Sequence, residues 1–228
     1  MSPKERFEQE LWPTPCFDPC RSDYTISGEA GKIDLYSKLT PIPGDVVDPL
    51  GGVKGEWLKK LIDEKIDLIC NVAGVVSFDP PLDEGMQVNV VGVQNLLELA
   101  RVLRPGSTAA TAVPMLHTST CYVAGGRTGV VFEDDPREFP FPRCDELDRS
   151  TWDPERELRE GMEIARHLRL RVNDADLQSQ FLDRAKSRLR ELNRPTTGEP
   201  LAQAIAKERS KWIDDELGEM GMQRAKHG

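Results

Sequence analysis

The chain has 228 residues, of which 30 are Lys or Arg and 39 are Asp or Glu, so its formal net charge is −9. General affinity for nucleic acid depends on neutralising phosphates with basic side chains, and an acidic chain argues against that function. No apolar run approaches the roughly 20 residues that span a bilayer, and the first ten residues are charged where a secretory signal is apolar. We therefore expect a cytoplasmic protein with no transmembrane segment.

The five cysteines are an odd number and contain no Cys-x-x-Cys spacing. Cys16 and Cys20 lie between prolines with no histidine nearby, so we expect no metal site there. Cys70 and Cys121 fall in or beside apolar runs, which predicts that they are buried and fill space in a sheet as small apolar side chains. All five are then expected to be thiols in a reducing compartment.

The first part of the chain predicts short elements separated by prolines. Residues 4–11 carry Phe7 and Leu11 four positions apart, which is the spacing of a helix, and the prolines that follow would end it. Residues 39–43 are a candidate strand. Residues 56–64 are predicted to form a short helix with its apolar side chains on one face.

The middle of the chain alternates strand-like and helix-like segments. Residues 66–71 form a nearly uninterrupted apolar run, as expected for a parallel strand covered on both faces. Residues 83–103 repeat apolar side chains at a helical period, and residues 113–118 are a second buried strand. This alternation predicts an α/β fold with a doubly wound, Rossmann-like parallel sheet, whose ligand crevice lies at the carboxyl ends of the strands.

After residue 142 β-branched residues become scarce, Arg and Glu become frequent, and apolar residues recur at helical spacing. We expect an α-helical appendage in which residues 193–200 separate the last two helices and the charges form a solvated face. The predicted organisation is an N-terminal helix and irregular segment over residues 1–37, a partial Rossmann-like domain over 38–143 and the appendage over 144–228.

Four groups of residues could carry chemistry at the crevice. The Asp45 carboxylate could accept a hydrogen bond from an exocyclic amino group, although a Gly-Asp pair is also common in turns. The small residues of 71–74 would let a flat ligand approach the backbone, and the hydroxyls of 118–120 suit a substrate carbonyl oxygen. Asn89 interrupts the apolar face of its helix, so if it is buried its amide must bond either to a neighbouring strand or to a ligand.

Together and in this order, these groups resemble the extended short-chain dehydrogenase/reductase superfamily and, within it, the fatty acyl-CoA reductases. The run Phe-Asp-Pro-Pro-Leu-Asp-Glu at 78–84 favours acyl-CoA reductases over sugar epimerases or thioester reductase domains. The resemblance covers residues 38–142, and the segments that carry it are Gly44–Val46, Asn71–Gly74, Phe78–Glu84, Val88–Ala100 and His117–Gly125.

Such a reductase is an oxidoreductase of lipid metabolism that passes hydride from NADPH to an acyl thioester such as acyl-CoA, giving an aldehyde and then an alcohol. NADH is the alternative coenzyme. The resemblance implies that Thr120 is the catalytic hydroxyl. It also implies that Asp45 and Val46 contact the adenine, and that Asn89 serves a cofactor contact or a proton relay. The implied cofactor-binding residues are Asp45, Val46, Asn71, Ala73, Gly74 and Asn89.

The chain departs from the family at two motifs. The family's proton donor is a Tyr with a Lys four residues later, which lowers the phenol pKa towards the working pH. The three tyrosines here are followed four positions later by Gly or Thr, so the pair is absent from the sequence. The family's GxxGxxG loop, which binds the pyrophosphate between the first strand and helix, is also absent, because none of the Gly-x-x-Gly runs in the sequence continues into a third Gly.

We therefore expect an internal piece of a larger reductase that lacks the first βαβ unit and is inactive alone. In the strand order 3-2-1-4-5, the strand at 39–43 would lose its neighbour, while those at 66–71 and 113–118 lie beyond the missing strands. The alternative is a non-catalytic interaction module, in which the charged helices of 152–228 dock a partner or the remainder of an enzyme. A glycine loop encoded upstream and Tyr-x-x-x-Lys downstream would favour the reductase.

Overall fold

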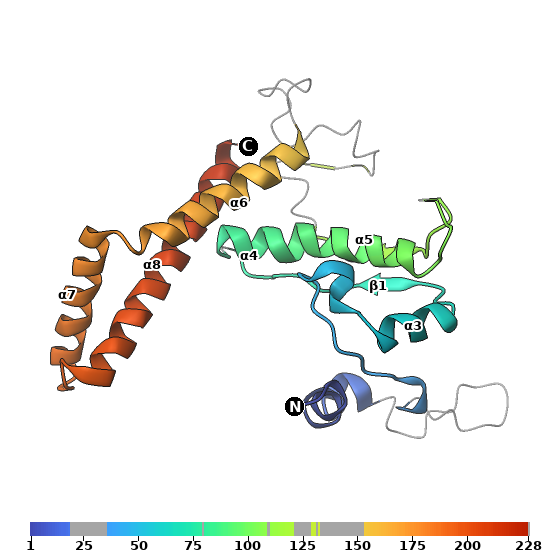
Figure 1. Cartoon of the computed structure of the whole chain (residues 1–228), viewed down its shortest axis with the longest axis horizontal. Coiled ribbons are helices and arrows are strands. Elements are labelled where there is room, and N and C mark those ends of the chain that lie inside the picture. Colours follow the sequence, from blue (N-terminus) through green and yellow to red (C-terminus); the bar gives the residue numbers. More distant parts are fainter. Residues whose placement is uncertain are drawn as a thin grey trace. The chain divides into compact units, whose positions relative to one another are not determined.

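The computed structural model describes residues 1–18, 36–78, 80–108, 110–120, 129, 130, 132 and 153–227. These residues form two compact units (Figure 1), and each is described on its own. The first unit is Met1–Ile69 with Gln94–Met115, and the second is Cys70–Val93 with Leu116–Gly228. Cys20, Cys121 and Tyr122 lie outside the described residues. The domain boundaries expected at 37/38 and 143/144 stay a prediction.

The first unit begins with the helix expected over residues 4–11, as α1 (Pro3–Arg6) and a π-helical turn η1 (Phe7–Leu11). Ser2 caps it reciprocally: Ser2 Oγ accepts from the Glu5 N–H at 3.2 Å, and the Glu5 carboxylate accepts from the Ser2 N–H at 2.7 Å. The Ser2 backbone N–H, and after it the Ser2 side chain, stabilise the Glu5 carboxylate and hold the pKa of Glu5 below its usual range. A short 3-10 turn, η2 (Pro15–Phe17), follows the first prolines.

The strand expected at 39–43 is absent, and that prediction was wrong. The segment follows a 3-10 turn, η3 (Tyr36–Lys38), and has no regular secondary structure. Pro41 and Pro43 have no N–H to donate, and the one sheet found in the described part of the chain lies elsewhere. An extended segment without a strand beside it has no ladder to join.

The core of the first unit lies between α3 (Glu56–Asp63) and the part of α5 (Gly92–Val102) that begins at Gln94. The helix expected at 56–64 is thereby confirmed, and its apolar face packs on this core. Buried residues at its centre are Val53, Leu99, Ala100, Leu103 and Val113. A tight 3-10 turn, η4 (Pro49–Gly52), leads into it and buries Gly51.

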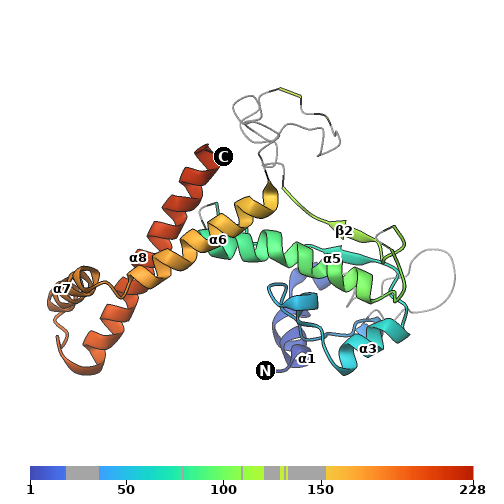
Figure 2. The same cartoon turned by 45° about the horizontal axis from the view of Figure 1, so that its top comes forward.

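The two strands expected in the middle of the chain are present but short: β1 (Ile69–Asn71) and β2 (Met115–His117) form a two-stranded sheet (Figure 2). The Ile69 N–H donates to the Pro114 carbonyl and the Thr118 N–H to the Asn71 carbonyl, each at 2.9 Å. This pattern is parallel and places Asn71 opposite His117.

One face of these strands is open. Cys70 is exposed, and Leu116 beside it on the same face is 60% exposed. The predicted burial of Cys70 was therefore wrong, because the described residues place no helix over that face, whereas a parallel strand inside a doubly wound sheet is covered on both sides.

The helix expected at 83–103 is confirmed, with a π-helical turn in its middle. It consists of α4 (Leu82–Met86), η5 (Gln87–Val91) and α5. Such turns add one residue to the helical ladder and are frequent at functional sites. Asn89 lies in this π turn.

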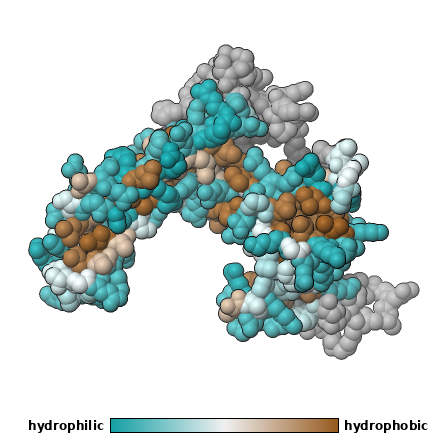
Figure 3. Space-filling model, viewed as in Figure 1, coloured by the Kyte–Doolittle hydropathy of each residue, from teal (hydrophilic) through white to brown (hydrophobic). Residues whose placement is uncertain are grey.

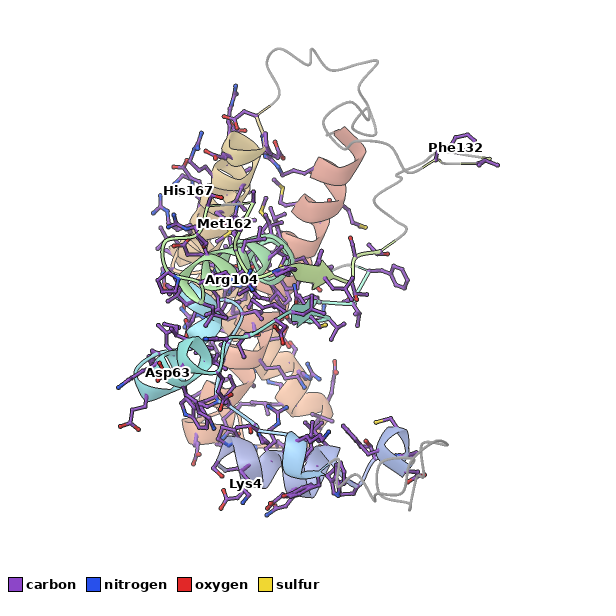
Figure 4. The ribbon with its side chains drawn as sticks, turned by 90° about the vertical axis from the view of Figure 1, so that its right-hand side faces the viewer. Lys4, Asp63, Arg104, Phe132, Met162 and His167 are labelled. Carbon is purple, nitrogen blue, oxygen red and sulfur yellow. The ribbon has the colours of Figure 1, made fainter. Side chains whose placement is uncertain are left out.

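The helical appendage of the second unit is confirmed as α6 (Pro154–Arg171), α7 (Ala175–Glu191) and α8 (Gly198–His227). Met162 and His167, labelled in Figure 4, both lie on α6. α7 packs on α8 through Phe181, whose ring is 6.0 Å from that of Trp212. Figure 3 shows apolar side chains between these two helices within a largely hydrophilic surface.

An ion pair joins the appendage to α4. Arg169 of α6 donates to the carboxylate of Asp83, which is only 9% exposed. The hydrogen bond that Arg169 donates to Asp83 raises the pKa of the Arg169 guanidinium. Asp83 of the 78–84 motif thus binds a helix that lies more than eighty positions later in the sequence.

Leu217 of α8 is fully buried in a cluster with Ala165 and Leu168 of α6. We expect Leu217→Ala to lower the free energy of unfolding by about 3 kcal/mol, because it removes buried methyl groups and leaves a cavity. Leu170→Ala is the matched control: Leu170 is 54% exposed, and the same change there should cost less than about 1 kcal/mol. Urea denaturation of the three proteins measures both, and equal effects would contradict this packing.

Candidate functional site

A short loop, residues 71–75, leaves β1 at the carboxyl end of the sheet. Asn71 is buried, with 4% of its surface exposed, and its Oδ1 accepts from the Ala73 N–H at 3.0 Å. Val72, Ala73 and Gly74 are exposed. A buried polar anchor therefore holds a turn whose small residues face outward.

Asn89 clamps the other end of this loop. Its Oδ1 accepts from the Val75 N–H at 2.8 Å, and its Nδ2 donates to the Val75 carbonyl at 3.2 Å. The sequence predicted a neighbouring strand or a ligand as the partner of Asn89. In the described structure its partner is the backbone of the loop that follows β1. Asn89 lies in the π turn and is exposed rather than buried.

Gly74 is the residue at which the loop approaches Asn89. A Cβ built on Gly74 would lie 3.3 Å from Asn89 Oδ1, closer than most real Cβ contacts. A larger residue would force the clamp to move. Gly at this position thus keeps the bond to Val75 and leaves the backbone uncovered.

The end of β2 contributes a residue that the sequence did not single out. His117 lies opposite Asn71 in the parallel register, and its Nδ1 is 3.1 Å from Asn71 Nδ2. The signal that could have found it is this register, since Asn71 is the last residue of the strand predicted at 66–71 and His117 is the last but one of the strand predicted at 113–118. Thr118, Ser119 and Thr120 follow it and are exposed.

Asp45 and Val46 belong to the first unit, where they form a turn. Asp45 Oδ1 accepts from the Val47 N–H at 3.1 Å, which is the side-chain-to-backbone bond of an Asx turn. The Val46 carbonyl accepts from Asn95 Nδ2 at 2.9 Å. The turn reading of Gly44–Asp45 thus holds, while the contact with an adenine stays a prediction.

Asn71, Ala73, Gly74 and Asn89 are brought together by the loop bonds of the second unit, and Thr120 follows β2 in that same unit. Among the described residues, no group of His, Cys, Asp and Glu could hold a metal ion. No helix within the described ranges is long and apolar enough to cross a membrane.

A family model described as "Male sterility protein", for an NAD-binding domain, matches residues 1–196. The chain belongs to this family. Its curated relatives are fatty acyl-CoA reductases, so this chain is a fatty acyl-CoA reductase-like member of the family. The resemblance predicted from its motifs is thereby confirmed.

Three relatives illustrate the likeness. Probable fatty acyl-CoA reductase 4 of Arabidopsis thaliana is 35% identical over 133 residues, which cover 58% of this chain and 25% of the relative. Probable fatty acyl-CoA reductase 5 of the same plant is 28% identical over 195 residues, covering 85% of this chain and 30% of the relative. The alcohol-forming fatty acyl-CoA reductase of Simmondsia chinensis is 27% identical over 99 residues, 43% of this chain and 19% of that protein.

This chain therefore spans less than a third of the length of the curated relatives it matches. No solved structure matches it.

The NAD-binding family model and the reductase relatives support a nicotinamide cofactor. The residues of the loop at 71–75 have the properties that such a cofactor needs. Its exposed Ala73 and Gly74 present bare backbone at the carboxyl end of a parallel strand, where such folds bind dinucleotides. A side chain at position 74 would crowd Asn89, so the glycine leaves this backbone uncovered. These residues fit a flat cofactor group, although the sequence contains no GxxGxxG motif for the pyrophosphate.

The hydrogen bond from the Val75 N–H to Asn89 should slow the exchange of that N–H with solvent. Asn89→Ala removes its acceptor, so we expect the Val75 N–H to exchange with solvent at least several-fold faster, while Asn89→Asp keeps the acceptor and most of the protection. Amide hydrogen exchange followed by NMR measures this. Asn95→Ala, which removes only the bond to Val46, is the control and should leave Val75 unchanged. Equal exchange in all four proteins would contradict the clamp.

Proposed function

We propose that this chain carries the cofactor and substrate crevice segment of an NADPH-dependent fatty acyl-CoA reductase. The observation that carries the proposal is the loop at 71–75, which two asparagines hold at the carboxyl end of β1 with Ala73 and Gly74 exposed. The order of its residues matches the motifs of the reductases that the chain resembles.

Each residue has a proposed role. Ala73 and Gly74 lie beside the cofactor and let it approach the backbone, while Asn71 and Asn89 hold the loop in shape for it. Asp45 and Val46, in the first unit, contact the adenine. Thr120 is the proposed catalytic hydroxyl, donating a hydrogen bond to the carbonyl oxygen of the acyl thioester. NADPH, when bound, supplies the hydride that reduces the thioester to an aldehyde and then an alcohol.

We further propose that the 228-residue chain is inactive by itself. A phosphate-binding loop supplies much of the affinity for a dinucleotide in this kind of fold, and the sequence contains none. It also contains no Tyr-x-x-x-Lys pair to act as the proton donor. The residues of 71–75 and 89 then provide part of a crevice whose other parts would come from a longer protein.

The alternative is an interaction module built on the charged helices α6 to α8. The structure favours this function less, because many of their charges pair with one another. Lys211 and Asp215 are 2.7 Å apart within α8, and Arg224 of α8 lies 2.6 Å from Glu157 of α6. Charges paired in this way support a solvated, internally stabilised set of helices.

The proposal predicts weak but local binding of NADPH. Isothermal calorimetry of the isolated chain should give no micromolar dissociation constant, and NADPH at several millimolar should still shift the backbone amide signals of Ala73 and Gly74 in NMR spectra. ATP at the same concentration is the control for non-specific phosphate contacts. Micromolar affinity would contradict the proposed dependence on a missing phosphate loop. Unchanged signals at Ala73 and Gly74 would contradict the site.

A further inference from the structure

The contacts of the Asn71 side chain determine which nitrogen of the His117 ring carries the proton. The two ends of the Asn71 side chain are told apart by the backbone: Oδ1 accepts from the Ala73 N–H, so Nδ2 is the group that faces His117. An amide NH2 group can only donate, and His117 Nδ1 must therefore be the acceptor. A neutral imidazole with an accepting Nδ1 carries its proton on Nε2. The hydrogen-bond network assigns this tautomer.

Asn71 is placed to enforce that assignment. It is 4% exposed, so turning its amide over would bury an N–H group against the Ala73 N–H and leave both donors unsatisfied. His117 is exposed, and its Nε2 has no hydrogen-bond partner among the described residues. The pair thus presents one oriented donor at the carboxyl end of β2.

We propose that His117 is a positioning residue of the crevice, which donates from Nε2–H to an oxygen acceptor of the bound cofactor or acyl thioester. This inference rests on the proposed function, because it places the ligand at the carboxyl ends of β1 and β2. His117 lies opposite Asn71, whose loop presents Ala73 and Gly74, and three residues before Thr120. A donor held by its neighbours before the ligand arrives loses little freedom when it binds.

The first experiment needs no ligand. Long-range 1H–15N correlation spectra of the whole chain report which ring nitrogen of each histidine carries the proton, and His117→Gln identifies the signals of His117 among those of His167 and His227. We expect His117 with Nε2 protonated and Nδ1 bare. Asn71→Asp keeps the acceptor for Ala73 but turns an oxygen towards His117, so Nδ1 should become protonated. A wild-type ring protonated on Nδ1 would overturn the inference.

The second experiment asks whether the donor meets a ligand. NADPH and butyryl-CoA are titrated separately at millimolar concentration, with the amide signal of Gly74 as the measure of binding. His117→Asn places an amide near the old Nδ1 and removes the outer donor, whereas His117→Gln keeps a donor near Nε2. For the ligand that accepts this bond, we expect His117→Asn to weaken binding roughly 2- to 12-fold and His117→Gln to stay within about twofold.

The outcomes separate the two proposals. Weakening for NADPH alone assigns the acceptor to the cofactor, and weakening for butyryl-CoA alone assigns it to the thioester. If either ligand shifts Gly74 and His117→Asn binds both as tightly as the wild type, the role of His117 is overturned and the proposed function stands. If neither ligand shifts Gly74 in the wild type, the proposed function fails and the role of His117 fails with it.

Discussion

Burial of the Asn71 amide at the end of β1 constrains everything around it, because water cannot satisfy both of its polar ends. One end is satisfied by the backbone of its own loop and the other by a side chain of the neighbouring strand. A register slip of one residue would turn His117 to the opposite face and leave the amide with a buried, unpaired donor. A single side chain therefore ties together the register of the sheet, the shape of the loop and the orientation of His117.

The helix that follows extends this constraint to the far end of the loop. Asn89 of the π-helical turn η5 bonds to the backbone of Val75, and the loop is held at both ends. The turn before it, α4, carries Asp83, whose carboxylate binds Arg169 of the appendage. The loop and the appendage thus depend on two polar residues six positions apart on one continuous helical stretch. Losing either partner of the half-buried ion pair would leave a charge near the α4–α6 contact without compensation.

The sequence predicted those parts of the fold that local periodicity determines. The helices at 83–103 and in the appendage follow from apolar residues at a 3.6-residue period, which needs no knowledge of distant contacts. It failed where the outcome depends on a neighbour: the segment at 39–43 has no adjacent strand, and Cys70 faces the uncovered side of the sheet. The residues of the loop at 71–75 were predicted, but His117 was not, because its partner lies 46 positions away and is known only once the strands are paired.

The prolines at 41 and 43 also limit how the segment at 39–43 can pair with another strand. In an extended chain the N–H and C=O groups of alternate residues face alternate edges, so both prolines lie on one edge and remove its donors. The N–H groups of Thr40, Ile42 and Gly44 lie on the other edge, and none of them donates a hydrogen bond within the described ranges. Such a segment can pair along one side only. It therefore cannot lie inside a sheet, where both edges of a strand must pair.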